Sequence, residues 1–124
     1  MEASPQIESF KDLKVWQHAM LLAERCYVAT RGFPREEHFG LTSQIRRAAS
    51  SIAANVAEGH GRENTGSFIQ FLRIAQGSLK ELETHLILSQ RIGILTTSDA
   101  PDLDQKCQDL GKMLRSLICS LQDR

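Results

Sequence analysis

The sequence predicts an all-α protein, folded as an antiparallel up-down-up-down four-helix bundle. Apolar residues recur at steps of three and four along four segments, glycine and proline separate these segments, and no alternating run of β-branched residues marks a strand. With 124 residues, 41% of them hydrophobic, the chain is long enough for one domain with its own core. We therefore predict a single domain over residues 1–124, with helices at residues 12–31, 41–58, 65–91 and 99–122 and a flexible N-terminus at residues 1–9.

The first predicted helix, residues 12–31, has Ser9 or Asp12 as its candidate N-cap, since both side chains accept hydrogen bonds from free backbone N–H groups. Two adjacent apolar stripes on it together span an arc of roughly 200°. Their members are Leu13, Trp16, Met20, Ala23 and Tyr27, and Val15, Ala19, Leu22, Cys26 and Ala29. Leu21 and Val28 fall outside even this arc. Such a width predicts contacts on two sides of the helix, with another subunit as a candidate for the second.

The second predicted helix, residues 41–58, repeats apolar residues on one face and carries mostly serine and alanine on the others. Its apolar positions are Leu41, Ile45, Ala48, Ile52 and Val56. Small side chains let neighbouring helices approach closely, so we expect this helix to lie centrally. Gly59 is predicted to end it as the C′ residue of a left-handed cap.

The third and fourth predicted helices, residues 65–91 and 99–122, share one apolar rhythm. The third has about 27 residues, or ~40 Å at 1.5 Å per residue, and Asn64 or Thr65 is its candidate cap. Spacing that averages about 3.5 residues favours near-parallel packing at shallow angles, as in four-helix bundles. The positions are Phe68, Leu72, Ala75, Leu79, Leu82 and Leu86 in the third helix, and Leu103, Cys107, Leu110, Leu114, Leu117 and Leu121 in the fourth.

Charge and cysteine content limit the classes of function. The 15 Lys and Arg residues balance the 15 Asp and Glu residues, which argues against binding of nucleic acid or membrane by bulk charge. No apolar run approaches the ~20 residues that span a bilayer, and the N-terminus lacks the pattern of a secretory signal. Three cysteines without a CxxC pair suit free thiols in a reducing compartment. We therefore predict a cytoplasmic protein that does not contact a membrane.

Catalytic chemistry has little support in the sequence. The four histidines lie in separate segments, and none belongs to an HExxH or a Glu-x-x-His pattern. Cys26 and Cys107 fall on apolar stripes, which indicates core packing. Residues 58–62 lack the GxxxxGK[ST] pattern of a phosphate loop, although Gly61 and Arg62 beside the third helix would make a weak anion site. We predict no enzyme and no catalytic residue, cofactor, metal or small-molecule substrate; a small hydrolase or metalloenzyme rests only on scattered His and Glu.

Basic residues support nucleic-acid binding better than any set of residues supports catalysis. Arg73, Lys80 and Arg91 fall within about 20° of one another on the third helix, and symmetry in an oligomer would repeat such a patch on a neutral protein. The alternative is a solvated face, or a set of pairs across subunits, with Glu58, Glu81 and Glu83. The full set of candidate nucleic-acid-binding residues is Arg46, Arg47, Arg62, Arg73, Lys80 and Arg91.

Asn55 borders the apolar face of the second helix, where its amide needs hydrogen-bond partners if it is buried. Either it ties this helix to a neighbour, or it contacts a ligand.

Several strings together resemble a known family. They are FKDLKVWQ (10–17), FPREE (33–37), GLTSQIRRAA (40–49), SIAANVAEG (51–59), FIQFLRIA (68–75) and GSLKELET (77–84). In this order they resemble the bacterial four-helix-bundle proteins first noticed as products of intervening sequences within 23S rRNA genes. The resemblance covers roughly residues 10–95, because the last helix is generic. The residues that we take as the family motif are Asp12, Leu13, Trp16, Gly40, Gln44, Asn55, Glu58, Gly59, Glu81 and Glu83.

The resemblance implies a shape more than an activity. It implies antiparallel four-helix bundles that assemble as ring-like homopentamers, and no established biochemical activity for most members. A distantly related branch, the accessory variability determinants of retroelements, binds nucleic acid through a basic surface. Ala53 stands where many relatives carry proline, which removes any kink expected there, and the neutral charge differs from the retroelement branch. We expect a non-catalytic homo-oligomer, a homopentamer, that contacts RNA or DNA; the alternative is a protein-binding scaffold with no nucleic-acid role.

Overall fold

Residues 8–123 of the chain are described by a computed structural model, and over these residues the protein is all-α, as predicted, without a strand. The long helices are α1 (Lys14–Thr30), α2 (Leu41–Gly61), α3 (Thr65–Arg91) and α4 (Ala100–Gln122). Two short 3-10 helices, Phe10–Asp12 and Arg35–Glu37, precede α1 and α2. Most of the N-terminus that we expected to be flexible, residues 1–7, lies outside the described residues.

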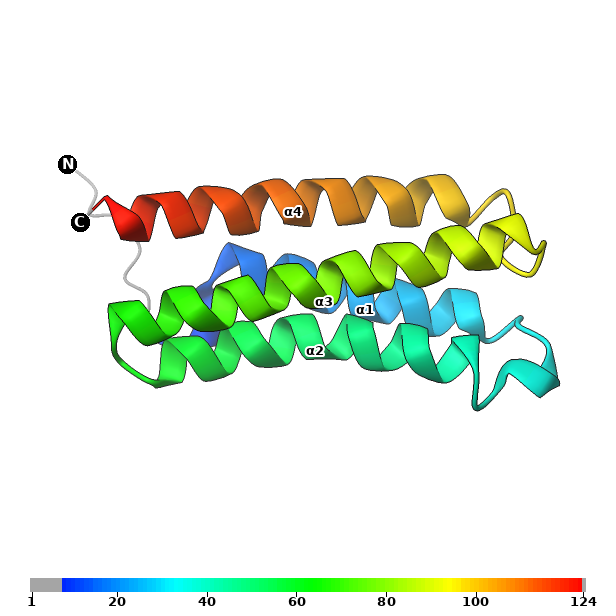
Figure 1. The fold of residues 1–124 in the computed structure, drawn as a ribbon, viewed down its shortest axis with the longest axis horizontal. Coiled ribbons are helices and arrows are strands. Elements are labelled where there is room, and N and C mark those ends of the chain that lie inside the picture. The colour runs from blue at the N-terminus through cyan, green and yellow to red at the C-terminus, as the bar shows by residue number, and fades with distance from the viewer. Residues whose placement is uncertain (1–7, 124) are drawn as a thin grey trace.

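The four helices lie side by side with their long axes roughly aligned (Figure 1). Each packs against two others, in the cyclic order α1, α2, α3 and α4. The connection from α1 to α2 and the connection from α3 to α4 lie at one end, and the turn from α2 to α3 lies at the other (Figure 1). Residues far apart in the sequence therefore meet along the length of the bundle.

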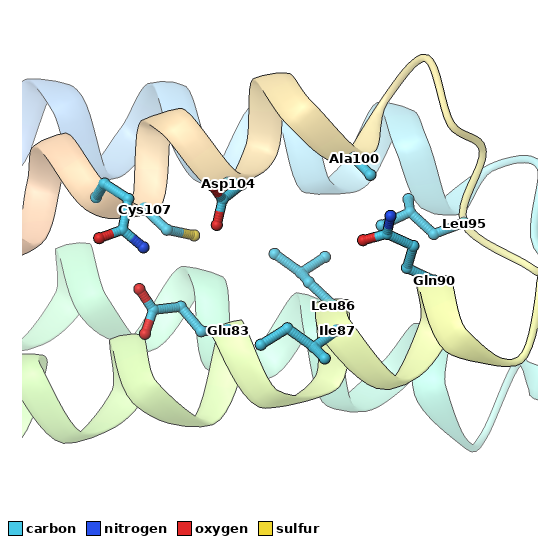
Figure 2. A pocket seen from close by; sticks show the side chains of 9 residues that line it. Glu83, Leu86, Ile87, Gln90, Leu95, Ala100, Asp104 and Cys107 are labelled. Atoms are coloured by element: carbon cyan, nitrogen blue, oxygen red, sulfur yellow. The ribbon is translucent and has the colours of Figure 1, made fainter.

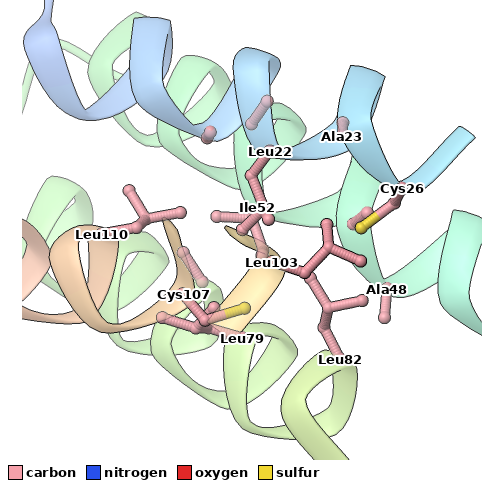
Figure 3. Packing of buried hydrophobic residues seen from close by; sticks show 14 of the residues in the cluster. Leu22, Ala23, Cys26, Ala48, Ile52, Leu79, Leu82, Leu103, Cys107 and Leu110 are labelled. Atoms are coloured by element: carbon pink, nitrogen blue, oxygen red, sulfur yellow. The ribbon is translucent and has the colours of Figure 1, made fainter. Parts of the chain in front are cut away.

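A core of aliphatic side chains from all four helices fills the space between them (Figure 3). Leu22, Ile52, Leu79 and Leu103 are at most 1% exposed, one from each helix. Burying a side chain of this kind contributes about 1.5–3 kcal/mol, so this shared core is the main source of stability. The predicted apolar positions from Leu72 to Leu86 of α3 are buried, which follows from their spacing.

The start of α1 differs from the prediction. Ser9 and Asp12 cap the 3-10 helix instead: the Ser9 hydroxyl accepts from the Lys11 N–H at 3.2 Å, and the Asp12 carboxylate accepts from the Ser9 N–H at 3.1 Å. The helix therefore begins at Lys14, after this turn, rather than at residue 12. By contrast, α3 has the predicted bounds, and the Asn64 side chain caps it by accepting from the Ser67 N–H at 2.9 Å.

The predicted helix end at Gly59 is wrong. Helix α2 continues to Gly61, and Gly59 is buried within it. A Cβ atom at Gly59 would lie 2.6 Å from the Cβ of Phe71 on α3, so glycine is required here for close approach of two helices. The left-handed conformation occurs later, at Glu63, where φ is 55°.

Helix α4 shows a smaller correction. We expected Leu117 on its buried stripe, but Leu117 is half-buried and Ile118 is 3% exposed. A straight α-helix has 3.6 residues per turn, so a 3.5-residue pattern drifts relative to the core. The four-residue step from Leu114 to Ile118 restores the alignment.

Ionic contacts join α1 to the beginning of α4. Arg25 donates to Asp102 at 2.9 Å and to Asp99 at 3.3 Å, and Lys106 donates to Asp102 at 2.7 Å. The hydrogen bonds from Lys106 and Arg25 lower the pKa of the Asp102 carboxyl, and the bond to Asp102 raises the pKa of Arg25. These contacts fix the end of the bundle at which the α1–α2 connection also lies.

The close approach at Gly59 predicts that an alanine substitution destabilises the protein at Gly59 but not at Gly77. Gly59→Ala should lower the free energy of unfolding by about 1–3 kcal/mol, since Phe71 must move to accept the new methyl group. The matched control is Gly77→Ala on the exposed face of α3, where the new methyl group would have no atom within 4 Å. It should raise the free energy of unfolding by up to about 1 kcal/mol, through helix propensity. Urea titration measures both, and equal effects would contradict the explanation for Gly59.

Candidate nucleic-acid interface

Three of the six candidate basic residues lie along the outer face of α3. Arg73, Lys80 and Arg91 are all exposed, and at 1.5 Å per residue they extend over ~27 Å of the helix. Lys80 donates to Glu83 at 2.9 Å, so one acid lies beside the basic residues rather than away from them. Arg73 and Arg91 form no ion pair within residues 8–123 and present their full charge to solvent.

Arg46 and Arg47 are neighbours in sequence but have different environments. Arg46 is half-buried: its Nε donates to the Thr30 hydroxyl at 2.9 Å and its Nη2 donates to the Tyr27 carbonyl at 3.3 Å. Its guanidinium also lies 4.6 Å from the centre of the Tyr27 ring. Arg47 is exposed and forms no ion pair with any described residue. Arg46 therefore joins α2 to α1, whereas Arg47 is free for a partner.

Arg62 lies at the other end of the molecule, directly after α2. Its guanidinium donates to Glu58 at 3.1 Å and covers the Phe71 ring at 5.1 Å. Because Arg62 follows the last residue of α2 while Arg46 and Arg47 lie near its beginning, the length of that helix separates them. The candidate set thus divides into a stripe on α3, a pair near the start of α2, and one isolated arginine.

The family-motif residues are mostly held by local contacts. Leu13 is buried, and the ring of Trp16 packs edge-on against Phe10 with 5.3 Å between centroids. Gly40 immediately precedes α2, whose first N–H group, that of Leu41, donates to the Glu37 carboxylate at 3.1 Å. Gln44 is exposed on the first turns of the same helix. Glu81 lies 3.6 Å from the imidazole of His85 on its own helix.

Within residues 8–123, the Asn55 side chain makes no hydrogen bond to another helix. Its side-chain amide donates to the Ser51 carbonyl one turn earlier, at 2.8 Å, and the residue is half-buried. The partner that we expected on a neighbouring helix is therefore supplied by its own backbone.

A small cavity between α3 and α4 is lined by both apolar and acidic side chains (Figure 2). Its volume is about 140 Å³, and Glu83, Asp104 and Cys107 face it. Burial, with smaller contributions from Cys26 and the two carboxylates, raises the pKa of the Cys107 thiol to about 12. Burial likewise raises the pKa of Cys26 to about 12. Both thiols therefore stay protonated at neutral pH, which suits the core packing predicted for them.

Neither a candidate metal site nor a membrane-spanning helix occurs among the described residues. Within residues 8–123, no three His, Cys, Asp or Glu side chains are grouped so that they could hold a metal ion. None of the described helices is long and apolar enough to cross a bilayer.

One surface feature near the start of α2 was not predicted from the sequence. Phe39 is 90% exposed, and it borders a surface depression that also contains Tyr27, Arg46 and Arg47. The signal was present in the sequence, as an aromatic residue between His38 and Gly40 in a connecting segment, but the spacing of helical residues does not detect it.

Comparisons with known proteins give a family match and a similar solved structure. A family model described as 23S rRNA-intervening sequence protein matches residues 11–116. No curated protein matches the chain. Among solved structures, the chain is similar to a crystal structure of a protein with unknown function from the S23 ribosomal protein family of Bacteroides thetaiotaomicron. The two share 27% sequence identity with a TM-score of 0.77, over 84% of this chain and 94% of the other.

The environments of Arg46 and Arg47 predict different effects on stability. Arg46→Ala should lower the free energy of unfolding by about 1–2 kcal/mol, because it removes a charged donor from Thr30 and the contact with Tyr27. Arg47→Ala, the matched control, should change it by less than about 0.5 kcal/mol. Chemical denaturation followed by circular dichroism distinguishes the two variants. If Arg46→Ala were as stable as the wild-type protein, the contacts of Arg46 with α1 would contribute nothing to the free energy of unfolding.

Proposed function

The chain belongs to the 23S rRNA-intervening sequence protein family, and from this we propose that it is a non-catalytic, homo-oligomeric bundle protein that contacts RNA or DNA through basic side chains of α2 and α3. The observation that carries this proposal is the outward stripe on α3, where Arg73 and Arg91 have no ion-pair partner among the described residues. Phosphate groups accept hydrogen bonds from guanidinium groups in a bidentate geometry, so unpaired surface arginines suit a phosphate backbone. Arg47 extends the same chemistry to α2.

Assembly into a homopentamer is part of the proposal, and exposed apolar side chains support it. Leu21 and Val28 on α1 are 52% and 47% exposed, and Ile74, Ile87 and Leu88 on α3 are 45–51% exposed. Surfaces of this composition are suited to subunit contact, although single exposed apolar residues are common. Symmetry would repeat each basic stripe once per subunit, which reconciles a neutral chain with binding to a polyanion.

The same proposal includes a single domain, an antiparallel up-down-up-down topology and a cytoplasmic location. Short connections and the alternating positions of the loops support the topology (Figure 1). The three free cysteines support a reducing compartment.

The second candidate is a protein-binding scaffold in which arginine and glutamate side chains pair across subunits. The balanced charge and the apolar exposure on α1 and α3 favour it. A structure of the assembly decides between the two, because burial of Arg73 and Glu81 between protomers would remove the proposed nucleic-acid surface.

Salt dependence tests the nucleic-acid contact. We expect filter-binding titrations with structured rRNA fragments to give an affinity that falls with salt, by about 0.7–0.9 logarithmic units per contacted phosphate and tenfold salt. Combining Arg73→Ala, Lys80→Ala and Arg91→Ala should reduce that slope by about two to three if one protomer binds.

The matched control removes three exposed cations elsewhere, with Lys14→Ala, Lys112→Ala and Arg115→Ala. It should leave the slope nearly unchanged. Absence of binding at low salt, an affinity indifferent to salt, or an equal loss in both triple variants would each contradict the proposed surface.

Light scattering tests assembly separately. We expect the purified protein at micromolar concentration to have a mass near five times the 13.9 kDa of one chain. A monomer would refute the homo-oligomer, and another closed number of subunits would refute the pentamer alone.

A further inference from the structure

A surface depression lies where the end of α1, the connection to α2 and the first turns of α2 meet. Its volume is about 300 Å³, at the lower end of the ~300–1,000 Å³ typical of sites for small organic groups. Its lining includes Tyr27, His38, Phe39, Thr42, Arg46 and Arg47. The lining contains two arginines, the rings of a tyrosine, a phenylalanine and a histidine, and no carboxylate.

Phe39 is the most exposed large apolar residue of those described. It is 90% exposed, and its ring forms a T-shaped pair with the His38 imidazole, with 4.7 Å between centroids. Tyr27 on α1 also lines the depression and is 43% exposed. A phenyl ring left in water at the margin of a concave site has a face available for stacking, since burying it against a flat apolar partner is favourable.

Hydrogen-bond donors beside the rings are fixed in position. Two N–H groups of Arg46 are used by Thr30 and the Tyr27 carbonyl, and its other three make no hydrogen bond to a described residue. These contacts hold the guanidinium in place before a ligand arrives, which lowers the entropic cost of binding. Arg47 adds an exposed charge.

Thr42 supplies a second kind of polar group. It is 6% exposed and lines the depression, and its hydroxyl makes no hydrogen bond to the described residues. No buried side-chain nitrogen or oxygen of the described residues lacks a partner, so this hydroxyl oxygen is reached by solvent in the depression and is open to a ligand. Glu37, which directly precedes the lining residue His38 in the sequence, has one carboxylate oxygen engaged by the Leu41 N–H and is not part of the lining.

We propose that this depression binds one unpaired nucleobase of a single-stranded nucleic acid, stacked on Phe39, with the adjoining phosphate on Arg46 and Arg47. This inference rests on the proposed function and deepens it, because it names single strands, rather than duplexes, as the preferred ligand. Phosphates of a duplex need only cations, whereas an aromatic side chain requires a base that has left its own stack. The Thr42 hydroxyl then faces the polar edge of the base.

The test is a fluorescence-anisotropy titration of the full chain with labelled oligouridine of ~12 nucleotides and with an RNA duplex of equal length. Wild-type protein should bind the single strand more tightly. Phe39→Ala and Phe39→Leu should each weaken single-strand binding by about tenfold, and Phe39→Trp should retain it, because stacking requires an aromatic face. Duplex binding should change less than twofold in all three. Ile92→Ala, which shortens an exposed apolar residue with no role in the proposed contacts, is the control and should change neither.

Oligodeoxyuridine, which differs from oligouridine only in the sugar, is titrated in parallel, so that the tighter of the two strands identifies the sugar that the site accepts. Several results would overturn the inference while the proposed function stands: unchanged single-strand affinity in Phe39→Ala, full affinity in Phe39→Leu, or equal loss on the duplex. Loss of assembly by Phe39→Ala in light scattering would assign the ring to a subunit contact and also overturn it. Failure of wild-type protein to bind any probe at low salt would remove the proposed function and this inference together.

Discussion

The close approach of α2 to α3 is the constraint on which the other features depend. At Gly59 the two helices come so near that a single methyl group would lie 2.6 Å from the Cβ of Phe71. Further along α2, Ala48, Ala49 and Ala53 are buried, so this helix is packed through small residues over much of its length. A helix engaged on two sides by α1 and α3 leaves a narrow outer face. Near the start of α2, this outer face carries Arg47 and borders the Phe39 depression.

Location, and not total charge, decides what the basic residues do. Arg46 and Arg62 are engaged by aromatic rings and oxygen acceptors of the same chain, and Lys80 is paired with Glu83. Arg47, Arg73 and Arg91 have no such partner among the described residues. A formal charge of zero therefore coexists with unpaired guanidinium groups on α2 and α3. At the start of α2, the contacts of Arg46 attach this helix to α1, and Arg47 beside it is exposed to a partner.

Much of this fold could be predicted from periodicity, and the errors have local physical causes. The spacing of Leu72, Leu79 and Leu86 is a property of one helix, so it locates α3 without knowledge of its neighbours. Gly59 could not be placed in the same way, because a glycine that ends a helix and one that admits Phe71 have the same sequence signal. The basic candidates were found as residue types, but their separation into paired and unpaired groups depends on contacts between helices. The Phe39 depression joins segments from α1 and α2, and no spacing within one helix reveals it.

The most direct test of this account locates bound nucleic acid on the chain. Oligouridine containing 4-thiouridine, irradiated with the wild-type protein and digested with trypsin, identifies the peptides that the bases touch. The account predicts crosslinks to the peptides covering residues 26–31 and 36–46, which carry Tyr27 and Phe39. Crosslinks confined to peptides of α4, or to the first half of α1, would contradict it.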